Sequence, residues 1–153
     1  MATKADEIKL GYRILKIQTT KFEFKDIDDA ELDSLFKNNG VGLNINVERT
    51  TDSEKSTITI DIRSRFFKKE GEIILVEHFC RTSYFIEGLR DVYDKKSDTF
   101  EFPKNFMIQL HGIAYTHARA LLATEISSTC YRDKYFLPII DSTILVDLSV
   151  NKE

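Results

Sequence analysis

Apolar and polar residues alternate along most of the first half of the chain, a pattern typical of half-buried β-strands. The first alternating stretch covers about residues 8–25, and its apolar positions change parity near residues 15–20. A parity change within one strand predicts a bulge or a bend. We therefore expect one long first strand that is kinked near residues 15–20.

Three further strands are predicted in the region that follows, separated by short polar turns. They are expected at Val41–Val47, Thr57–Phe67 and Glu72–Phe85, after a short helix at Glu31–Asn38. The run Ile73–Val76 is apolar on both parities, which indicates cover on both faces of the fourth strand. Because short turns join these strands, the simplest pairing is an antiparallel meander.

The strongest helical pattern begins after Pro103 and continues to about Ser127. Two apolar stripes run side by side along this helix and leave only a narrow polar face. A helix that is apolar over so much of its circumference must be covered on more than one side. We expect the sheet to cover one stripe and a partner subunit to cover the other. The residues assigned to this oligomer interface are Met107, Ala114, Ala118 and Leu122; the alternative is a helix sandwiched inside a monomer.

The segment from Cys130 to Val150 contains β-prone apolar runs and is expected to be mostly extended. No repeat or Pro/Gly/Ser-rich linker marks a domain boundary, so residues 1–153 are expected to form one domain. The predicted fold class is α+β. It consists of a four-stranded antiparallel meander sheet with one long helix packed on one side.

The amino-acid composition argues against several classes of function for this protein. The 22 Lys and Arg residues against 25 Asp and Glu residues give a net charge of −3, which argues against nucleic acid as a partner. No signal peptide and no apolar run of membrane-spanning length is visible, so we expect a cytoplasmic protein without membrane insertion. Two cysteines in such a chain are expected to be reduced, and a Cys80–Cys130 disulfide is the less favoured alternative.

Motifs of catalysis and metal binding are scarce. The chain has no nucleophile elbow, P-loop or dinucleotide-binding motif. His111 and His117 are six residues apart and do not share a helix face. His78 and Cys80 share a strand face, but a zinc site needs three or four ligands. We therefore expect no enzyme, no catalytic residue, no metal and no cofactor.

The aromatic content is the unusual feature of the composition. The chain has 11 Phe and 6 Tyr residues and no Trp. Core packing accounts for most of these rings, but a small sheet with one helix cannot hide all of them. Aromatic rings that stay exposed would form a groove for an apolar peptide or ligand.

Five segments, in this order and spacing, resemble the SecB family of export chaperones over about residues 10–145. They are Tyr12–Ile17, Leu75–Glu77, Ile86–Leu89, Tyr115–Arg119 and Tyr135–Asp141. The resemblance implies a homotetramer, built as a dimer of dimers, with the long helices at the interface. It also implies an ATP-independent holdase whose hydrophobic grooves bind unfolded or precursor polypeptides rich in aromatic residues, for protein export. The rings assigned to peptide binding are Phe22, Phe24, Phe79, Tyr84 and Phe85.

Two departures from the family pattern bear on partners. Leu75 and Glu77 match part of the patch that docks the translocase motor, but the matching first-strand positions are Lys21 and Lys25 rather than acids. The family's lid helix is expected to be short or missing, because residues 144–148 have the pattern of a strand. The alternatives are a dedicated chaperone of a toxin–antitoxin system and a small-molecule carrier with a cavity between sheet and helix.

Overall fold

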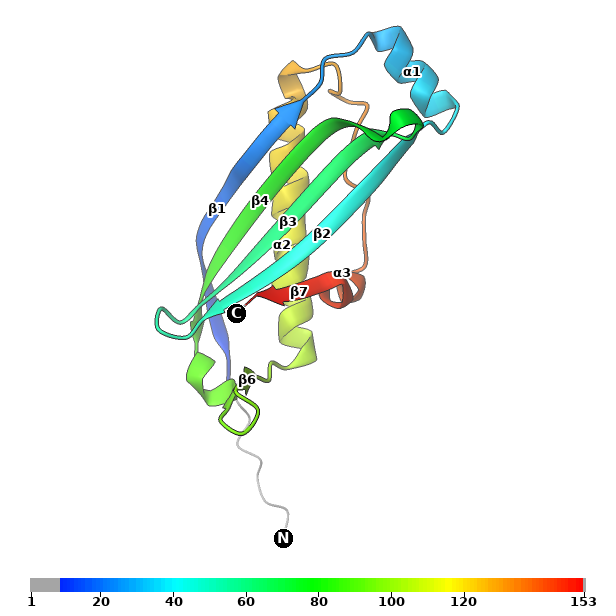
Figure 1. The fold of residues 1–153 in the computed structure, drawn as a ribbon. Helices are drawn as coiled ribbons and strands as arrows, with labels where there is room; N and C mark the ends of the chain where they lie inside the picture. The colour runs from blue at the N-terminus through cyan, green and yellow to red at the C-terminus, as the bar shows by residue number, and fades with distance from the viewer. Residues whose placement is uncertain (1–8, 153) are drawn as a thin grey trace.

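The computed structural model describes residues 9–152, which form a twisted sheet with helices against one face (Figure 1). The sheet order is β1-β4-β3-β2-β7. The strands are β1 (Gly11–Phe24), β2 (Val41–Asp52), β3 (Thr57–Lys68), β4 (Ile73–Glu87) and β7 (Ser149–Lys152). The α+β class is confirmed, but the sheet has five strands rather than four. The fifth, β7, runs parallel to β2 at the sheet edge.

The meander is confined to β2, β3 and β4, which pair in sequence order. The first strand pairs with β4 rather than with β2. The connection from β1 to β2, which contains α1 (Asp29–Lys37), therefore crosses the upper end of the sheet in Figure 1. This arrangement makes β1 one edge of the sheet and β7 the other.

The predicted kink in β1 is confirmed as two irregularities in its pairing with β4. The register shifts between Ile14 and Lys16 and again between Thr19 and Lys21. Each extra residue inverts the alternation that follows it. As a result, apolar residues of both parities in this strand lie on the face that the helices cover.

A third irregularity explains the apolar run at the start of β4. The register with β3 shifts at Leu75, so both Leu75 and Val76 are buried. Ile73 and Ile74 are exposed, so the expected cover on both faces is wrong for these two residues. A bulge, rather than a second covering layer, accounts for the loss of alternation.

The long helix α2 (Lys104–Glu125) packs on the inner face of the sheet, where the Tyr84 hydroxyl donates to the Leu110 carbonyl oxygen at 2.8 Å. The stripe that we expected to face a partner subunit lies inside this subunit instead. Its members Met107, Ala114, Ala118 and Leu122 are 3%, 0%, 0% and 1% exposed. The chain's own sheet and C-terminal segment cover them, so this stripe is not available for contacts with another subunit.

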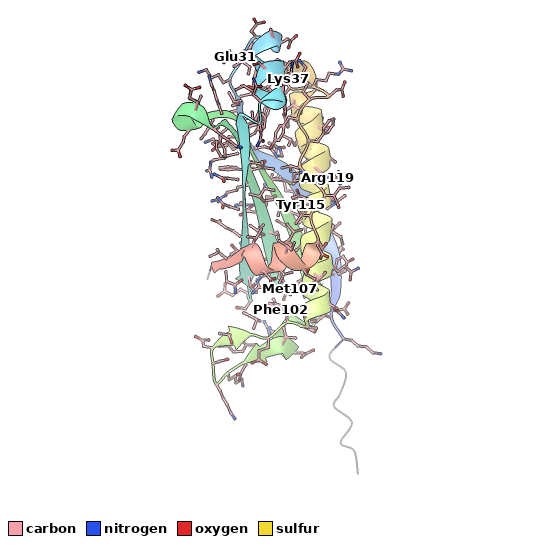
Figure 2. The ribbon with its side chains drawn as sticks, turned by 90° about the vertical axis from the view of Figure 1, so that its right-hand side faces the viewer. Glu31, Lys37, Phe102, Met107, Tyr115 and Arg119 are labelled. Carbon is pink, nitrogen blue, oxygen red and sulfur yellow. The ribbon has the colours of Figure 1, made fainter. Side chains whose placement is uncertain are left out.

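Short elements complete the chain. They are η1 (Glu70–Glu72), η2 (Leu89–Val92), the hairpin strands β5 (Tyr93–Asp94) and β6 (Thr99–Phe100), η3 (Ile126–Ser128) and α3 (Ser142–Leu148). Figure 2 shows α3 lying across the space between the sheet and α2. The strand expected at residues 144–148 is therefore wrong, and a short helix stands there. Among residues 9–152, no helix is long and apolar enough to cross a membrane.

Candidate functional site

The C-terminal segment carries large apolar side chains that the described chain leaves about half or more exposed. We call Phe136, Ile139, Ile144, Leu148 and Val150 the C-terminal apolar strip. Their exposed fractions are 61%, 86%, 51%, 45% and 61%. Soluble monomers rarely expose so many large apolar side chains within one short segment without a function in binding.

Buried neighbours hold this strip in place. Leu137 and Leu145 are 2% and 0% exposed and anchor the segment in the core. The Tyr115 hydroxyl donates to the Pro138 carbonyl oxygen at 2.5 Å, and Arg119 Nε donates to the Leu137 carbonyl oxygen at 3.2 Å. Asp141 caps α3 by accepting from the Thr143 amide at 2.9 Å. The strip is therefore presented by a fixed backbone.

A cavity of about 670 Å³ lies beside the lower end of this strip, and we call it the basal pocket. Asn151 of β7 lines it and follows Val150 of the strip directly. Aromatic walls come from the connection between β4 and α2, in the rings of Tyr93, Phe100 and Phe102. Figure 2 labels Phe102 between the β5–β6 hairpin and α3. A volume of this size is typical of a ligand or peptide side-chain site.

The aromatic wall is a chain of ring contacts. Tyr93 and Phe100 have ring centroids 5.2 Å apart, and Phe100 and Phe102 are stacked at 5.9 Å. Phe102 continues the row by stacking on Phe106 of α2 at 6.3 Å. The rings therefore support one another and need no client to hold their positions.

Charged side chains line the rest of the basal pocket. Arg49 of β2, Arg90 and Lys95 are cationic, and Asp98 is the acid beside them. The Arg49 guanidinium lies over the Phe102 ring at 5.3 Å. Burial lowers the pKa of Arg49. The Asp98 carboxylate accepts a hydrogen bond from the Tyr93 hydroxyl.

The five rings assigned to peptide binding are not brought together. Phe22 and Phe24 stack on each other at 5.7 Å near the end of β1. Tyr84 is fully buried and belongs to the core. Phe79 and Phe85 alternate with Tyr84 along β4 and lie on the outer face, which no helix covers. The sequence analysis assigned none of the basal-pocket rings Tyr93, Phe100 and Phe102 to peptide binding, because the segment that joins β4 to α2 has no clear periodic pattern.

The residues assigned to motor docking are enclosed rather than open. Leu75 is 2% exposed at the β4 bulge. Glu77 on the outer face forms ion pairs with Lys21 and Arg65. Burial opposes ionisation of Glu77, but the hydrogen bonds from these two cations outweigh it and lower the pKa of the carboxylate. This acid is thus part of a neutralised network.

Buried groups near α2 lack the features of a catalytic site. Burial lowers the pKa of His78 to about 4 and raises the pKa of Cys80 to about 12. The imidazole is therefore neutral and the thiol protonated at pH 7. Cys80 and Cys130 are both free. Within the described part of the chain, no three His, Cys, Asp or Glu residues gather as a metal site would require.

Comparison with known proteins gives a match at the level of structure. No family model matches the sequence, and no curated protein does. The SecB-like chaperone Rv1957 of Mycobacterium tuberculosis, solved with a ChAD peptide from the Rv1956 HigA1 antitoxin, superposes with a TM-score of 0.54 at 8% identity. The match covers 84% of this chain and 87% of that one. A protein of unknown function from Streptococcus agalactiae has a TM-score of 0.45 at 10% identity, over 86% and 99% of the two chains. The fold of this chain is SecB-like.

Proposed function

We propose that this protein is an ATP-independent chaperone of the cytoplasm that holds extended, aromatic-rich segments of non-native polypeptides. It is a binding protein rather than an enzyme. The C-terminal apolar strip and the basal pocket together form its client surface. Clients bind there because apolar burial contributes about 25 cal/mol per Å² and reads no particular sequence.

The observation that carries this proposal is the exposure of the strip on an anchored backbone. Ile139 is 86% exposed and Phe136 61%, although their neighbour Leu137 is buried. A rigid apolar surface loses little conformational entropy when a client covers it. The basal pocket, which Asn151 lines, offers aromatic rings to side chains of the client.

A dedicated client is a second candidate. The structural neighbour Rv1957 is bound to a peptide from an antitoxin, and that finding supports a toxin–antitoxin partner. The closed pairing of Glu77 with Lys21 and Arg65 supports the same choice, because an export chaperone needs an open acidic surface for the translocase motor. For a general client, the route that we propose is export of precursor proteins.

Self-association is proposed on the opposite side of the molecule. The edge strand β1 exposes Ile14, Leu15 and Ile17 at 41%, 49% and 41%. The exposed face of α2 lies toward this edge, since Gln109 Nε2 donates to the Tyr12 hydroxyl at 2.8 Å. An unpaired edge strand beside an apolar face is suited to an isologous contact between copies. We propose that such contacts build a tetramer.

Light scattering of a chemically denatured, aggregation-prone enzyme tests the holdase function. At a ratio of one or a few chaperone subunits per client molecule, the wild-type protein is expected to suppress aggregation with no nucleotide present. The double variant Phe136→Ser/Ile139→Ser removes two exposed side chains of the strip and is expected to lose most of this suppression. Its thermal unfolding is expected to stay unchanged, because neither side chain is buried.

The matched control is Ile73→Ser/Ile74→Ser, which removes two apolar side chains exposed at 37% and 47% at the start of β4, outside the C-terminal apolar strip. This control is expected to suppress aggregation like the wild type. If wild-type protein leaves several different clients unprotected, the chaperone function is wrong. Equal loss in both variants would show that clients use the apolar surface without preference for the strip.

A further inference from the structure

Unlike its neighbours in the sheet, Arg49 has no carboxylate partner among the described residues. On the outer face, Arg63 pairs with Glu48 at 3.0 Å and Arg81 with Asp61 at 2.8 Å. Arg49 lies on the inner face, where it is opposite Ile60, and it is half-buried. No carboxylate among residues 9–152 forms an ion pair with it. A partly desolvated cation without a counter-charge favours binding of an anion.

The lining of the basal pocket strengthens this preference. Arg90 and Lys95 add two cations. The acid Asp98 is already engaged by the Tyr93 hydroxyl. The protein as a whole carries a net charge of −3, so the excess of positive charge here is local and opposite in sign to the rest of the molecule. Such a site attracts negatively charged segments.

The geometry combines that charge with an aromatic surface. The Arg49 guanidinium lies over the Phe102 ring at 5.3 Å, and a guanidinium carries five N–H donors in a planar fork. These donors match both oxygens of a carboxylate. Phe100 and Tyr93 stand in the same wall. A ligand that presents a carboxylate next to an aromatic ring would use both features at once.

We propose that the basal pocket selects client segments in which an aromatic residue neighbours Asp or Glu, and that Arg49 determines this specificity. The occupant that we propose is a polypeptide segment, because Asn151, which lines the pocket, directly follows Val150 of the C-terminal apolar strip in the chain, and the cationic lining complements an acidic side chain of such a segment. This inference rests on the proposed client-binding function and adds a chemical preference to it.

Fluorescence anisotropy with two fluorescein-labelled peptides tests the proposal. Both are twelve-residue, otherwise uncharged peptides with a central Phe, and they differ only in whether Glu or Gln flanks that ring. The wild-type protein is expected to bind the Glu peptide about tenfold or more tightly than the Gln peptide, the gain typical of a charge-assisted hydrogen bond. Added salt is expected to weaken the Glu peptide alone.

Arg49→Gln is expected to equalise the two affinities and to leave binding of the Gln peptide unchanged. The control Arg13→Gln removes a cation that also lies over a ring, Phe85 at 5.2 Å, but on the outer face, and it is expected to keep the tenfold preference. Arg90→Gln/Lys95→Gln changes two exposed side chains and is expected to reduce the preference severalfold, which keeps the test valid if Arg49→Gln does not fold.

Each other outcome identifies a specific error. Equal binding of both peptides to the wild type overturns the charge preference and leaves the chaperone function standing. Binding of neither peptide overturns both. If phenylacetate binds as tightly as the Glu peptide, the pocket serves a small molecule and the polypeptide occupant is wrong. If dilution dissociates an oligomer and peptide binding is lost at the same time, the pocket depends on contacts between copies of the chain.

Discussion

Ala118 and Ala120 of α2 are two residues apart, yet the structure gives their substitution by Glu opposite consequences. Ala118 is 0% exposed, whereas Ala120 lies on the exposed face of the same helix. Ala118→Glu is therefore expected to damage the fold of the subunit. Ala120→Glu is expected to leave the fold intact and to disturb contacts between subunits.

The size of the first effect follows from burial. A carboxylate placed at position 118 has no room and no counter-charge in the core, and overpacking alone costs about 1–3 kcal/mol. An unpaired buried charge adds several kcal/mol more. The sum is about 4 kcal/mol or more, against a total stability of about 5–15 kcal/mol for an ordinary domain. The expected fall in Tm is about 10 °C or more.

Circular dichroism melts and light-scattering mass measurements on both variants separate the two effects. Ala120→Glu is expected to melt within about 2 °C of the wild type, because Glu is a good helix former at an exposed site. Its mass is expected to fall below that of the wild-type oligomer. Ala118→Glu is expected to show the large loss of Tm whatever its mass.

The reasoning is refuted if Ala118→Glu melts like the wild type and only its mass changes. That result would mean that the buried stripe of α2 is open to a partner and that the sheet does not cover it. An unchanged mass for Ala120→Glu, with the wild type oligomeric, would move the proposed interface off this face. A monomeric wild type would remove the proposed tetramer altogether.

Three further predictions concern stability. Burial lowers the pKa of His78 from 6.5 to about 4, so between these pH values the unfolded chain binds a proton that the folded chain does not. The free energy of unfolding should therefore fall by about 3 kcal/mol as the pH drops from 6.5 to 4. Denaturant titrations at several pH values should find this pH dependence reduced in His78→Gln. Asp141→Ala removes the cap of α3 and should cost about 1 kcal/mol, seen as faster hydrogen exchange of α3 amides with little change in α2. Tyr84→Phe removes the hydroxyl bonded to Leu110 and should lower stability by about 1 kcal/mol, whereas an unchanged denaturation midpoint would show that this hydrogen bond contributes nothing.

The sequence predicted those parts of the fold that depend on neighbouring residues. The parity change in the first strand correctly indicated bulges, which the structure places near Leu15 and Thr20. The hairpins from β2 to β4 follow from short turns between alternating segments. The long helix begins one residue after Pro103, as its pattern predicts. Each of these features depends on residues that are close together in the sequence.

Features that depend on contacts between distant parts of the chain could not be predicted from the sequence pattern. Alternation shows which residues share a face of β4 but not which face α2 covers, so Tyr84 was assigned with Phe79 and Phe85 although it lies opposite them. The β-branched residues Ile144 and Val146 favour a strand locally. The Asp141 cap and the burial of Leu145 favour the observed helix instead.

The C-terminal segment also changes the argument for oligomerisation. A helix apolar on two sides needs two covers. The segment supplies the second by burying Leu137 and Leu145 beside α2, so a partner subunit is not required for that stripe. The exposed side of α2 lies toward β1, as the Gln109–Tyr12 hydrogen bond shows, whereas the proposed client surface includes residues of β2 and β7 at the opposite edge.

Opposite edges allow the two proposed surfaces to work independently. If self-association used the client surface, peptide binding and oligomer mass would change together. With separate edges, Ala120→Glu is expected to lower the mass while keeping peptide affinity within about twofold of the wild type. Phe136→Ser/Ile139→Ser is expected to do the reverse, because both side chains belong to the strip. A variant that lost both properties while staying folded would show that the two edges are coupled.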